Sequence, residues 1–309
     1  MRLAVMDLVV ERRKGKKYRK TRKDGKTRRR ATWRLVSATS QLVNSSSAAE
    51  DPQVAAAVRA QHDTVVGYVN TPVGTSAQRL EAARGVVEDV AIIDFVNYVQ
   101  AAAVKKGLTG ADAALPVLSI AASFSRTAVF PQGPITIRDV AGLYVFDNTL
   151  YGVRITGAQL RAYLEFSARY YKQVSGPGPF TIDQLTNAVT ATAPSGTPDF
   201  NYDAVAGLDA DLVYDIDVTR APGSRITALT YAGAPVTDAQ QFVMAINNYR
   251  QSGGGGFPAV STAPVVYNRQ DEIRQLLIDW VLANKTIDPA LFASTDWRLV
   301  SGGNAVVVN

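Results

Sequence analysis

The change from strand to helix is clearest in residues 149–171, which have the sequence TLYGVRITGAQLRAYLEFSARYY. Side chains alternate in character through TLYGVRIT, which is typical of a strand with one buried face. Gly157 then leads into AQLRAYLEFSARYY, which predicts a helix. A strand that passes directly into a helix places the chain among the folds that combine both kinds of element.

Helices and strands interleave along the chain from about residue 70. We predict a helix over 89–105, a buried strand over 115–123 and a turn or short helix near 138–141. A loop rich in Pro and Gly is expected over 174–200. Further strands are expected in YDAVAGLDADLVYDIDVT, ITALTYAG and QFVMAINNY, and a last helix in DEIRQLLIDWVLAN, from about Gln270. Because no regular βαβ repeat joins them, the expected fold class is α+β, or mixed α/β.

The N-terminal part has a different pattern. LAVMDLVV (3–10) and ATWRLVSA (31–38) predict two strands, with the turn signal Asp24-Gly25 between them. Residues 1–40 are therefore expected to form a long hairpin, which is marginally stable alone and should pack on something. A Ser-rich linker follows, and Asp51-Pro52 then starts a helix predicted over 52–69.

Charge is unevenly distributed. The chain of 309 residues has a formal net charge of +6, yet residues 12–34 contain 14 Lys or Arg and a single acid, Asp24. This leaves 19 of the 33 basic and 26 of the 27 acidic residues elsewhere, a net charge of −7. The basic segment is either a solvated hairpin tip or a site of weak attraction to a polyanion such as RNA, anionic cell wall or membrane.

Several classes of protein are excluded by simpler features. No stretch reaches the roughly 18 to 20 apolar residues of a membrane span. The basic cluster follows the first apolar run, which is the wrong order for a secretory signal peptide, so none is expected. The absence of cysteine excludes disulfides and thiolate metal sites.

A single histidine, His62, lies within the predicted helix 52–69. Two-metal phosphoesterases need several His, Asp and Asn ligands around their ions. A Ser-His-Asp triad is also disfavoured, since no G-x-S-x-G segment is present. We therefore expect no metal ion or other cofactor in this chain, and no hydrolysis by the chain alone.

Two loop segments are candidates for binding. NNYRQSGGGGFP (247–258) lacks the Lys and the following helix of a phosphate-binding loop. It is either a flexible surface loop or a glycine-lined site where Phe257 stacks on a planar ring. LYVFDNTLYG (143–152) is either a strand that ends in an Asx turn above core aromatics, or a strand end that presents Phe146 and Asn148 to a pocket.

Three long motifs occur in an order that resembles the C-terminal domain of the 5′-nucleotidase family. They are GLYVFDNTLYGVRITGAQLRAYLEFSARYY, FNYDAVAGLDADLVYDIDVT and FVMAINNYRQSGGGGFP. The branch that is most similar is the bifunctional 2′,3′-cyclic-nucleotide 2′-phosphodiesterase/3′-nucleotidases, and the resemblance covers about residues 65–285. LPVLSIAASF (115–124) is similar to the strand where 5′-nucleotidases carry N-G-G-G-I-R.

This resemblance implies a domain organisation. Residues 1–50 are expected to be the terminal strands and linker of a metallophosphoesterase domain, 51–69 a connecting helix, and 70–309 a nucleotide-binding C-terminal domain. The rest of the metallophosphoesterase domain, with two divalent metal ions, is expected before residue 1. The chain is then a truncated phosphoric ester hydrolase, inactive alone, whose parent enzyme is extracellular, cell-wall-bound or periplasmic.

The resemblance also implies how a nucleoside or nucleotide binds. The base is expected between Phe146 and Phe257, with Asn148 bonded to the base edge or ribose, and with Tyr144 and Tyr249 in the core or behind the site. The remaining predicted substrate-binding residues are Asp147, Gly254, Gly255, Arg84, Arg126 and Ser119.

Two of these matches are loose. Arg126 and Ser119 lie near the equivalent of N-G-G-G-I-R, but the Asn is replaced and the Arg is displaced. Arg84 stands where relatives have an arginine that contacts ribose or phosphate. The function implied is nucleoside recognition in a metal-dependent nucleotidase or cyclic-nucleotide phosphodiesterase. The alternatives are a non-enzymatic polyanion-binding protein acting through residues 12–34 and a complete enzyme of unknown mechanism.

Overall fold

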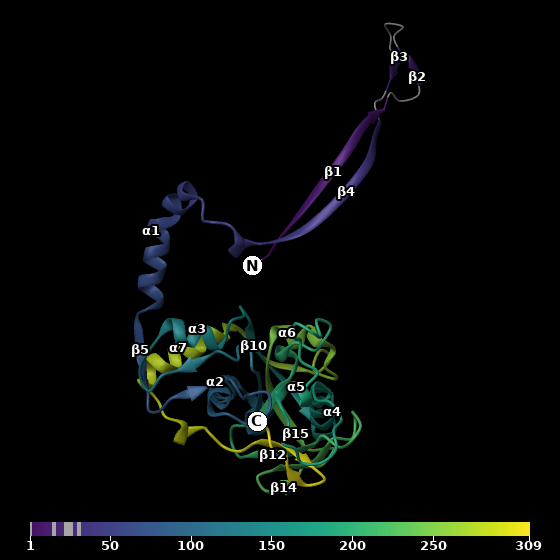
Figure 1. Ribbon diagram of the computed structural model, residues 1–309. Helices are drawn as coiled ribbons and strands as arrows, with labels where there is room; N and C mark the ends of the chain where they lie inside the picture. The colour runs from purple at the N-terminus through teal and green to yellow at the C-terminus, as the bar shows by residue number, and fades with distance from the viewer. Residues whose placement is uncertain (1, 14–16, 22–26, 30–31) are drawn as a thin grey trace. The chain divides into compact units, whose positions relative to one another are not determined.

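The structure is a computed structural model that describes residues 2–13, 17–21, 27–29 and 32–309. It divides into two compact units, Met1–Val65 and Val66–Asn309 (Figure 1).

The first unit is a long hairpin followed by a helix. Strands β1 (Arg2–Arg13) and β4 (Thr32–Asn44) pair antiparallel, with a bulge between Val9 and Val10. Strands β2 (Lys17–Thr21) and β3 (Thr27–Arg29) form a second short pair. The predicted hairpin is confirmed, whereas its Asp24-Gly25 turn lies outside the described residues.

The predicted helix over 52–69 is confirmed as α1 (Pro52–Val69). The Asp51 carboxylate caps it by accepting the backbone N–H groups of Gln53 and Val54, at 2.8 and 3.2 Å. The linker is shorter than expected, because pairing with β1 keeps the chain extended as far as Asn44. A short 3₁₀ turn, η1 (Ser45–Ser47), follows. Within the described residues no helix is both long and apolar enough to cross a membrane.

Apolar side chains of the first unit remain exposed. Those on the hairpin are Leu3, Met6, Leu8, Val9, Val10, Trp33, Leu35, Val36 and Leu42. No residue of α1 is buried. The described side chains of this unit therefore do not form the hydrophobic core that a two-stranded ribbon needs for independent stability.

The second unit is built on a five-stranded sheet in the order β11-β7-β15-β10-β16. Only β7 and β15 are parallel neighbours; the other pairs are antiparallel. The strands are β7 (Val117–Ala122), β10 (Thr149–Thr156), β11 (Asp203–Gly207), β15 (Gln241–Asn247) and β16 (Val265–Glu272). All six residues of β7 are buried.

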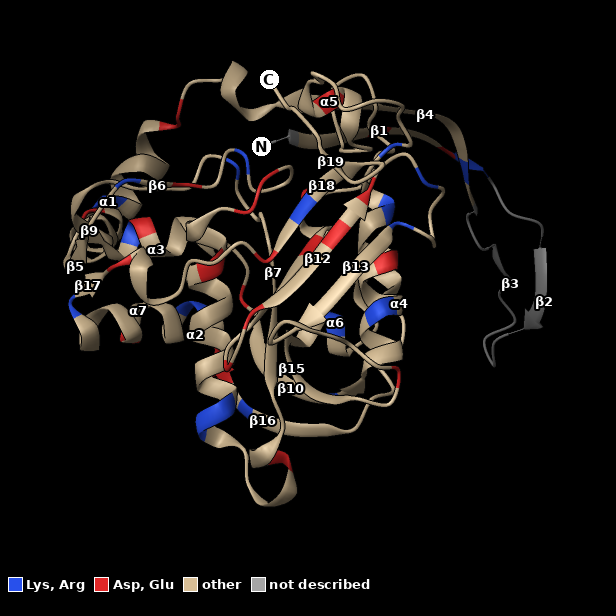
Figure 2. Cartoon of the chain, turned by 90° about the horizontal axis from the view of Figure 1, so that it is seen from below, with Lys and Arg blue, Asp and Glu red and all other residues tan. Residues whose placement is uncertain are grey.

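Helices cover this sheet on both sides. Figure 2 shows α2 (Ala91–Gly107) and α4 (Gly157–Ser167) on opposite sides of β7, β15 and β10. Thr156 caps α4 through a reciprocal capping box with Gln159, so the strand-to-helix change in the sequence is fixed by local hydrogen bonds. The 3₁₀ turn η3 (Ala168–Tyr170) continues α4.

A second sheet has the order β14-β13-β12-β18-β19. Its strands are β12 (Leu212–Asp217), β13 (Ile226–Tyr231), β14 (Ala234–Pro235), β18 (Trp297–Ser301) and β19 (Asn304–Ala305). Smaller sheets join β17 (Thr286–Ile287), β5 (Pro72–Ser76) and β9 (Gly133–Thr136), and β6 (Leu80–Glu81) with β8 (Val129–Phe130).

The remaining helices are short or lie beside these strands. They are η2 (Gly110–Ala114), α3 (Ile137–Leu143), α5 (Ile182–Leu185), η4 (Asp199–Asn201), α6 (Asn248–Gln251), η5 (Gly254–Gly256), α7 (Ile273–Asn284) and η6 (Pro289–Leu291).

The mixed α+β class is confirmed, two element predictions are corrected, and one strand of the second sheet was missed. YDAVAGLDADLVYDIDVT forms two strands, β11 and β12, because the chain turns back after Gly207. The last helix begins at Ile273 rather than near Gln270, since residues 265–272 pair with β10 as β16. Strand β18 was not predicted.

A cluster of three carboxyl groups joins β18 to the start of α2. Asp89 Oδ2 accepts the backbone N–H groups of Asp296 and Trp297, at 2.6 and 3.4 Å. Ligand-type oxygens of Asp89, Asp94 and Asp296 lie within 4.8 Å of one another. Burial, followed by the charges of Asp89 and Asp296, raises the pKa of Asp94 to about 10. Burial, followed by the charge of Asp89, raises the pKa of Asp296 to about 7.

This cluster should make stability fall with rising pH. An unfolded aspartate titrates near pH 4, so protonated Asp296 favours folding below about pH 4, and the contribution is lost as pH rises through about 7. Asp296→Asn stays neutral and keeps an acceptor for the Ser294 hydroxyl, which lies 3.0 Å from the carboxylate. Relative to wild type, its free energy of unfolding should rise by roughly 1–3 kcal/mol between pH 5 and pH 8.

Urea unfolding at both pH values measures this difference. Asp238→Asn, at an exposed position, is the matched control and should show no pH-dependent gain. An equal effect of Asp296→Asn at both pH values would contradict the prediction.

Candidate functional site

A buried ion pair holds the loop that follows β15. Arg250 is 1% exposed, and its Nε and Nη2 lie 2.7 and 3.0 Å from the two carboxylate oxygens of Asp203 on β11. The Tyr163 hydroxyl of α4 donates to the same carboxylate at 2.5 Å. Burial alone would lower the pKa of Arg250, but the Asp203 carboxylate raises it above its ordinary value, so the guanidinium stays charged.

The other donors of Arg250 reach two further segments. Nη2 donates to the Phe200 carbonyl at 2.6 Å, and Nη1 lies 3.2 Å from both Asn201 Oδ1 and the Gly254 carbonyl. One side chain thus ties the glycine run, Gly253–Gly256, to η4 and to the central sheet.

The glycine run has a steric explanation. Gly253, Gly255 and Gly256 have φ values of +93°, +75° and +72°, where a side chain is strained. A Cβ on Gly254 would lie 2.5 Å from the ring of Tyr249. The ring therefore lies directly on the backbone of Gly254.

Two partly exposed aromatic residues lie at the end of the central sheet where β10 begins and β15 ends. The β10–β15 ladder ends with Leu150 opposite Asn247, and the Thr149 N–H donates to Asn248 Oδ1 at 3.2 Å. The loops that carry Phe146, which is 39% exposed, and Tyr249, which is 42% exposed, therefore leave the sheet side by side.

Phe146 also belongs to a ring cluster. Its ring meets those of Phe124 and Phe200 edge to face, with centroids 5.5 and 5.7 Å apart. We call Phe124, Phe146, Phe200 and Tyr249 the aromatic edge.

The predicted turn residues lie beside this edge. The side-chain amide of Asn148 donates to the Tyr144 hydroxyl at 3.2 Å, and the backbone carbonyl of Asn148 accepts the N–H of Ile273 at 3.0 Å. The exposed Asp147 carboxylate pairs with Arg274 Nη2 at 2.8 Å. Tyr144 is buried, in agreement with its predicted core position.

Phe257 does not face Phe146, so this part of the prediction is wrong. Phe257 is 3% exposed and packs against the rings of Tyr163 and Phe166, with centroids 4.6 and 4.8 Å away. The Arg250 guanidinium lies 4.2 Å from its ring centroid. The ring is therefore covered by neighbouring side chains of the domain.

Tyr249 was predicted to lie in the core or behind the site, and it is exposed instead. Its position in the sequence could have indicated this exposure, because Tyr249 lies two residues after the end of β15 and four residues before the glycine run.

Two predicted polar residues do not reach the aromatic edge. Ser119 is fully buried in β7, where its hydroxyl accepts from Gln100 Nε2 at 3.1 Å. Arg84 pairs with Glu88 at 2.6 Å and donates to the Val308 carbonyl at 2.8 Å, beside the C-terminal segment. Burial in a strand and engagement elsewhere remove both from the candidate surface.

Arg126 is placed differently. Its Nε and Nη2 bind the Asp199 carboxylate at 2.6 and 2.8 Å, and Nη2 also donates to the Tyr170 hydroxyl at 3.1 Å. Because Asp199 immediately precedes Phe200, Arg126 is held next to the aromatic edge. Its side chain is only partly buried.

The described residues offer no His-rich two-metal centre. The one cluster with metal-ligand character among them is Asp89, Asp94 and Asp296, where burial raises the pKa of all three carboxyl groups. His62 lies on α1, in the first unit of the chain.

Comparisons with known proteins match most of the chain to nucleotidases and related phosphoesterases. The family model described as 5′-nucleotidase, C-terminal domain, matches residues 65–262. The trifunctional nucleotide phosphoesterase YfkN of Bacillus subtilis is 30% identical over 270 residues, which are 80% of this chain and 18% of YfkN. A 2′,3′-cyclic-nucleotide 2′-phosphodiesterase/3′-nucleotidase of Haemophilus influenzae is 31% identical over 279 residues, which are 82% of this chain and 40% of that protein.

Solved structures show the same fold. A Staphylococcus aureus protein assigned to the 5′-nucleotidases, crystallised with alpha-ketoglutarate, superposes with a TM-score of 0.64 at 23% identity. The match covers 91% of this chain and 49% of that one. The chain therefore spans less than half the length of these relatives.

The Arg250–Asp203 pair should be essential for stability. Asp203→Asn leaves a buried guanidinium without its counter-charge, so the free energy of unfolding should fall by about 3–5 kcal/mol. Asp215→Asn is the matched control, because it breaks a pair with an exposed arginine, Arg298, and should cost about 1 kcal/mol or less. Urea unfolding measures both, and equal losses would contradict the central role of the buried pair.

Proposed function

The chain belongs to the 5′-nucleotidase family, and we propose that it supplies nucleoside recognition to a metal-dependent nucleotidase or 2′,3′-cyclic-nucleotide phosphodiesterase. The comparisons favour this function over polyanion binding through residues 12–34. Most side chains of that basic segment fall outside the described residues.

The observation that carries the proposal is the pair of exposed rings, Phe146 and Tyr249, at the end of the β10–β15 ladder. A base that lies between them gains stacking on both faces, about 1–3 kcal/mol for each base–aromatic contact. Stacking does not depend on the identity of the base, which suits an enzyme that accepts several nucleotides. Tyr249 takes the role that the sequence assigned to Phe257.

Polar groups beside the rings can fix the rest of the nucleoside. Asn148 holds its amide against the Tyr144 hydroxyl, which leaves its side-chain oxygen for the base edge or ribose. Arg126 is oriented by Asp199 and Tyr170, so its partly exposed guanidinium can meet a ribose hydroxyl or a phosphate oxygen.

Phosphate ester hydrolysis is assigned to a metallophosphoesterase domain outside this chain. Two divalent ions there would generate the attacking nucleophile and stabilise the developing charge. The role of this chain is to bind and orient the nucleoside. We propose an extracellular, cell-wall or periplasmic location for the parent enzyme.

The first unit fits the same proposal. Its hairpin exposes apolar side chains on β1 and β4, and a ribbon of two strands needs a larger sheet or core. We assign residues 1–50 to the terminal strands and linker of the metallophosphoesterase domain, and α1 to the connection with the nucleotide-binding domain.

Nucleoside binding should depend on both exposed rings. Phe146→Ala and Tyr249→Ala should each weaken adenosine binding about tenfold, the equivalent of losing one stacked face. Titration calorimetry measures the change. Tyr68→Ala, at an exposed aromatic residue of α1, should leave the affinity unchanged. Unchanged affinity in both ring variants would reject the stacking site.

Gly254→Ala tests whether adenosine binding depends on where the Tyr249 ring lies. The added Cβ would displace the ring, so adenosine affinity should fall although Tyr249 remains. Gly142→Ala is the control, because a Cβ there meets no atom within 4 Å.

The chain alone should not hydrolyse nucleotides. With Mn²⁺ or Zn²⁺ added, it should release no phosphate from 3′-AMP and should leave 2′,3′-cyclic AMP intact, because the described residues lack a two-metal ligand set. Turnover by the isolated chain, measured by chromatography of the products, would favour a complete enzyme instead.

A further inference from the structure

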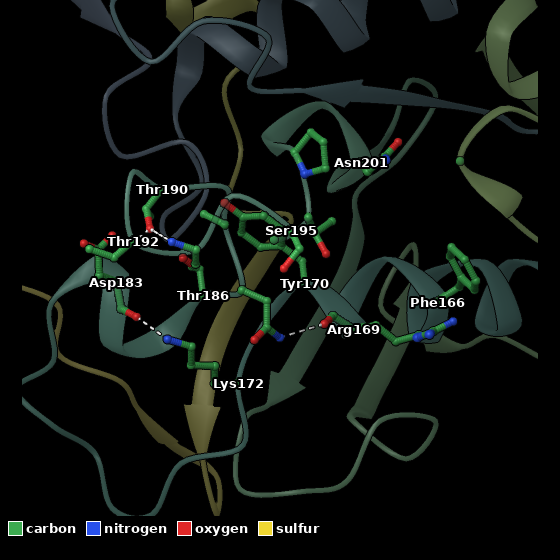
Figure 3. A pocket seen from close by; sticks show the side chains of 17 residues that line it. Phe166, Arg169, Tyr170, Lys172, Asp183, Thr186, Thr190, Thr192, Ser195 and Asn201 are labelled. Atoms are coloured by element: carbon green, nitrogen blue, oxygen red, sulfur yellow. Dashed lines mark hydrogen bonds between the residues drawn. The ribbon is translucent and has the colours of Figure 1, made fainter. Parts of the chain in front are cut away.

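A cavity of about 790 Å³ is lined in part by η4, through Asn201. Its walls come from η3, from α5 and from the loop over 186–198 (Figure 3). Asn201 and Gly255 also line it, and both lie close to Arg250 Nη1. Neither Phe146 nor Tyr249 lines it. Its volume is within the range of about 300–1,000 Å³ that is usual for small-molecule sites.

Two cations in this cavity have no carboxylate partner among the described residues. The Arg169 guanidinium lies 4.8 Å from the ring centroid of Phe166. Lys172 Nζ donates to the backbone carbonyl of Asp183 at 2.6 Å, as the dashed line in Figure 3 shows. The Asp183 carboxylate also lines the cavity, so two positive charges face one negative charge. The surplus favours an anionic ligand.

Hydroxyl groups line part of the cavity wall. They belong to Thr186, Thr190, Thr192, Ser195 and Thr197. Figure 3 labels Thr186, Thr190, Thr192 and Ser195 among the lining residues, and the Oγ1 atoms of Thr190 and Thr192 lie 3.1 Å apart. Such a wall can donate to and accept from the hydroxyls of a sugar.

Thr186 is the most informative of these residues. It is 2% exposed, and its Oγ1 interacts with the Tyr170 hydroxyl but makes no hydrogen bond of normal geometry among the described residues. A buried hydroxyl that is only weakly satisfied costs stability unless a ligand or a water completes its hydrogen bonding. Thr186 lines the cavity, so a ligand bound there can supply that partner.

We propose that this cavity binds a sugar phosphate. Arg169 and Lys172 hold the phosphate by charge-assisted hydrogen bonds. Thr186 and the neighbouring hydroxyls hold the sugar. The site is separate from the aromatic edge, and its existence does not depend on the proposed function.

The cavity and the aromatic edge share one wall. Phe200 packs against Phe146, whereas the next residue, Asn201, lines the cavity. The sugar phosphate is therefore either a free molecule or the second unit of a dinucleotide whose first base lies on the aromatic edge. Only the dinucleotide source rests on the proposed function.

Titration calorimetry of the full chain with ribose 5-phosphate tests the site. Arg169→Gln and Lys172→Gln should each weaken binding about tenfold, the effect of losing one charge-assisted contact. Lys106→Gln makes the same change of charge on α2 at an exposed position away from the cavity, and should have no effect. Ribose and inorganic phosphate should each bind more weakly than ribose 5-phosphate.

Variants of Thr186 distinguish a ligand contact from a structural role. Thr186→Val removes only the hydroxyl, so binding should weaken while the melting temperature stays the same or rises. Thr186→Ser keeps the hydroxyl and should retain binding. A fall in melting temperature with unchanged affinity would assign Thr186 to structure alone and would contradict its proposed contact.

Phe146→Ala separates this site from the nucleoside site. It should weaken adenosine but leave ribose 5-phosphate unaffected. If the dinucleotide ApA binds more tightly than adenosine, and Arg169→Gln removes only that gain, the cavity holds the second unit of a dinucleotide. If ApA binds no more tightly than adenosine, the cavity holds a free sugar phosphate. No saturable binding of ribose 5-phosphate to the wild-type chain would overturn the proposal, whatever the outcome with adenosine. Wild-type affinity in both the Arg169→Gln and the Lys172→Gln variant would overturn it as well.

Discussion

The buried guanidinium of Arg250 is the constraint on which the ligand-facing part of the second unit depends. A charge removed from water is tolerated only when a counter-charge and hydrogen-bond acceptors surround it. Here Asp203 supplies the charge, while Phe200, Asn201 and Gly254 supply the acceptors. These partners come from a strand, a 3₁₀ turn and the glycine run. Satisfying one side chain therefore sets the relative positions of three segments that are distant in sequence.

The two candidate ligand surfaces follow from this arrangement. Phe200 turns toward the aromatic edge, and Asn201 and Gly255 line the cavity. The glycine run gives backbone space instead of phosphate contacts, because its residues have left-handed φ values or lie under the Tyr249 ring. In the function that we propose, the domain holds the organic part of a substrate, and hydrolysis depends on metal ions held elsewhere in the parent enzyme.

Local periodicity was sufficient for the long buried elements of the second unit. Strands β7 and β10 and helices α2 and α4 are buried on defined faces, so their apolar residues recur with the period of the element. Strand β16 lies at the sheet edge, and most of its side chains are exposed or only partly buried, so VVYNRQDE has no such pattern. Its strand state comes from pairing with β10, which residue-by-residue periodicity does not record.

The sequence by itself determined the family, the mixed α+β class, the N-terminal hairpin and the two loops to which we assign the proposed nucleoside site. These properties depend on motif order and on short-range patterns. Only the tertiary structure decided which aromatic side chain is available in the second loop. Phe257 is covered by Tyr163, Phe166 and Arg250, whereas Tyr249 is raised onto Gly254 and stays exposed. Exposure is set by neighbours that lie many residues away along the chain, so motif matching cannot assign it.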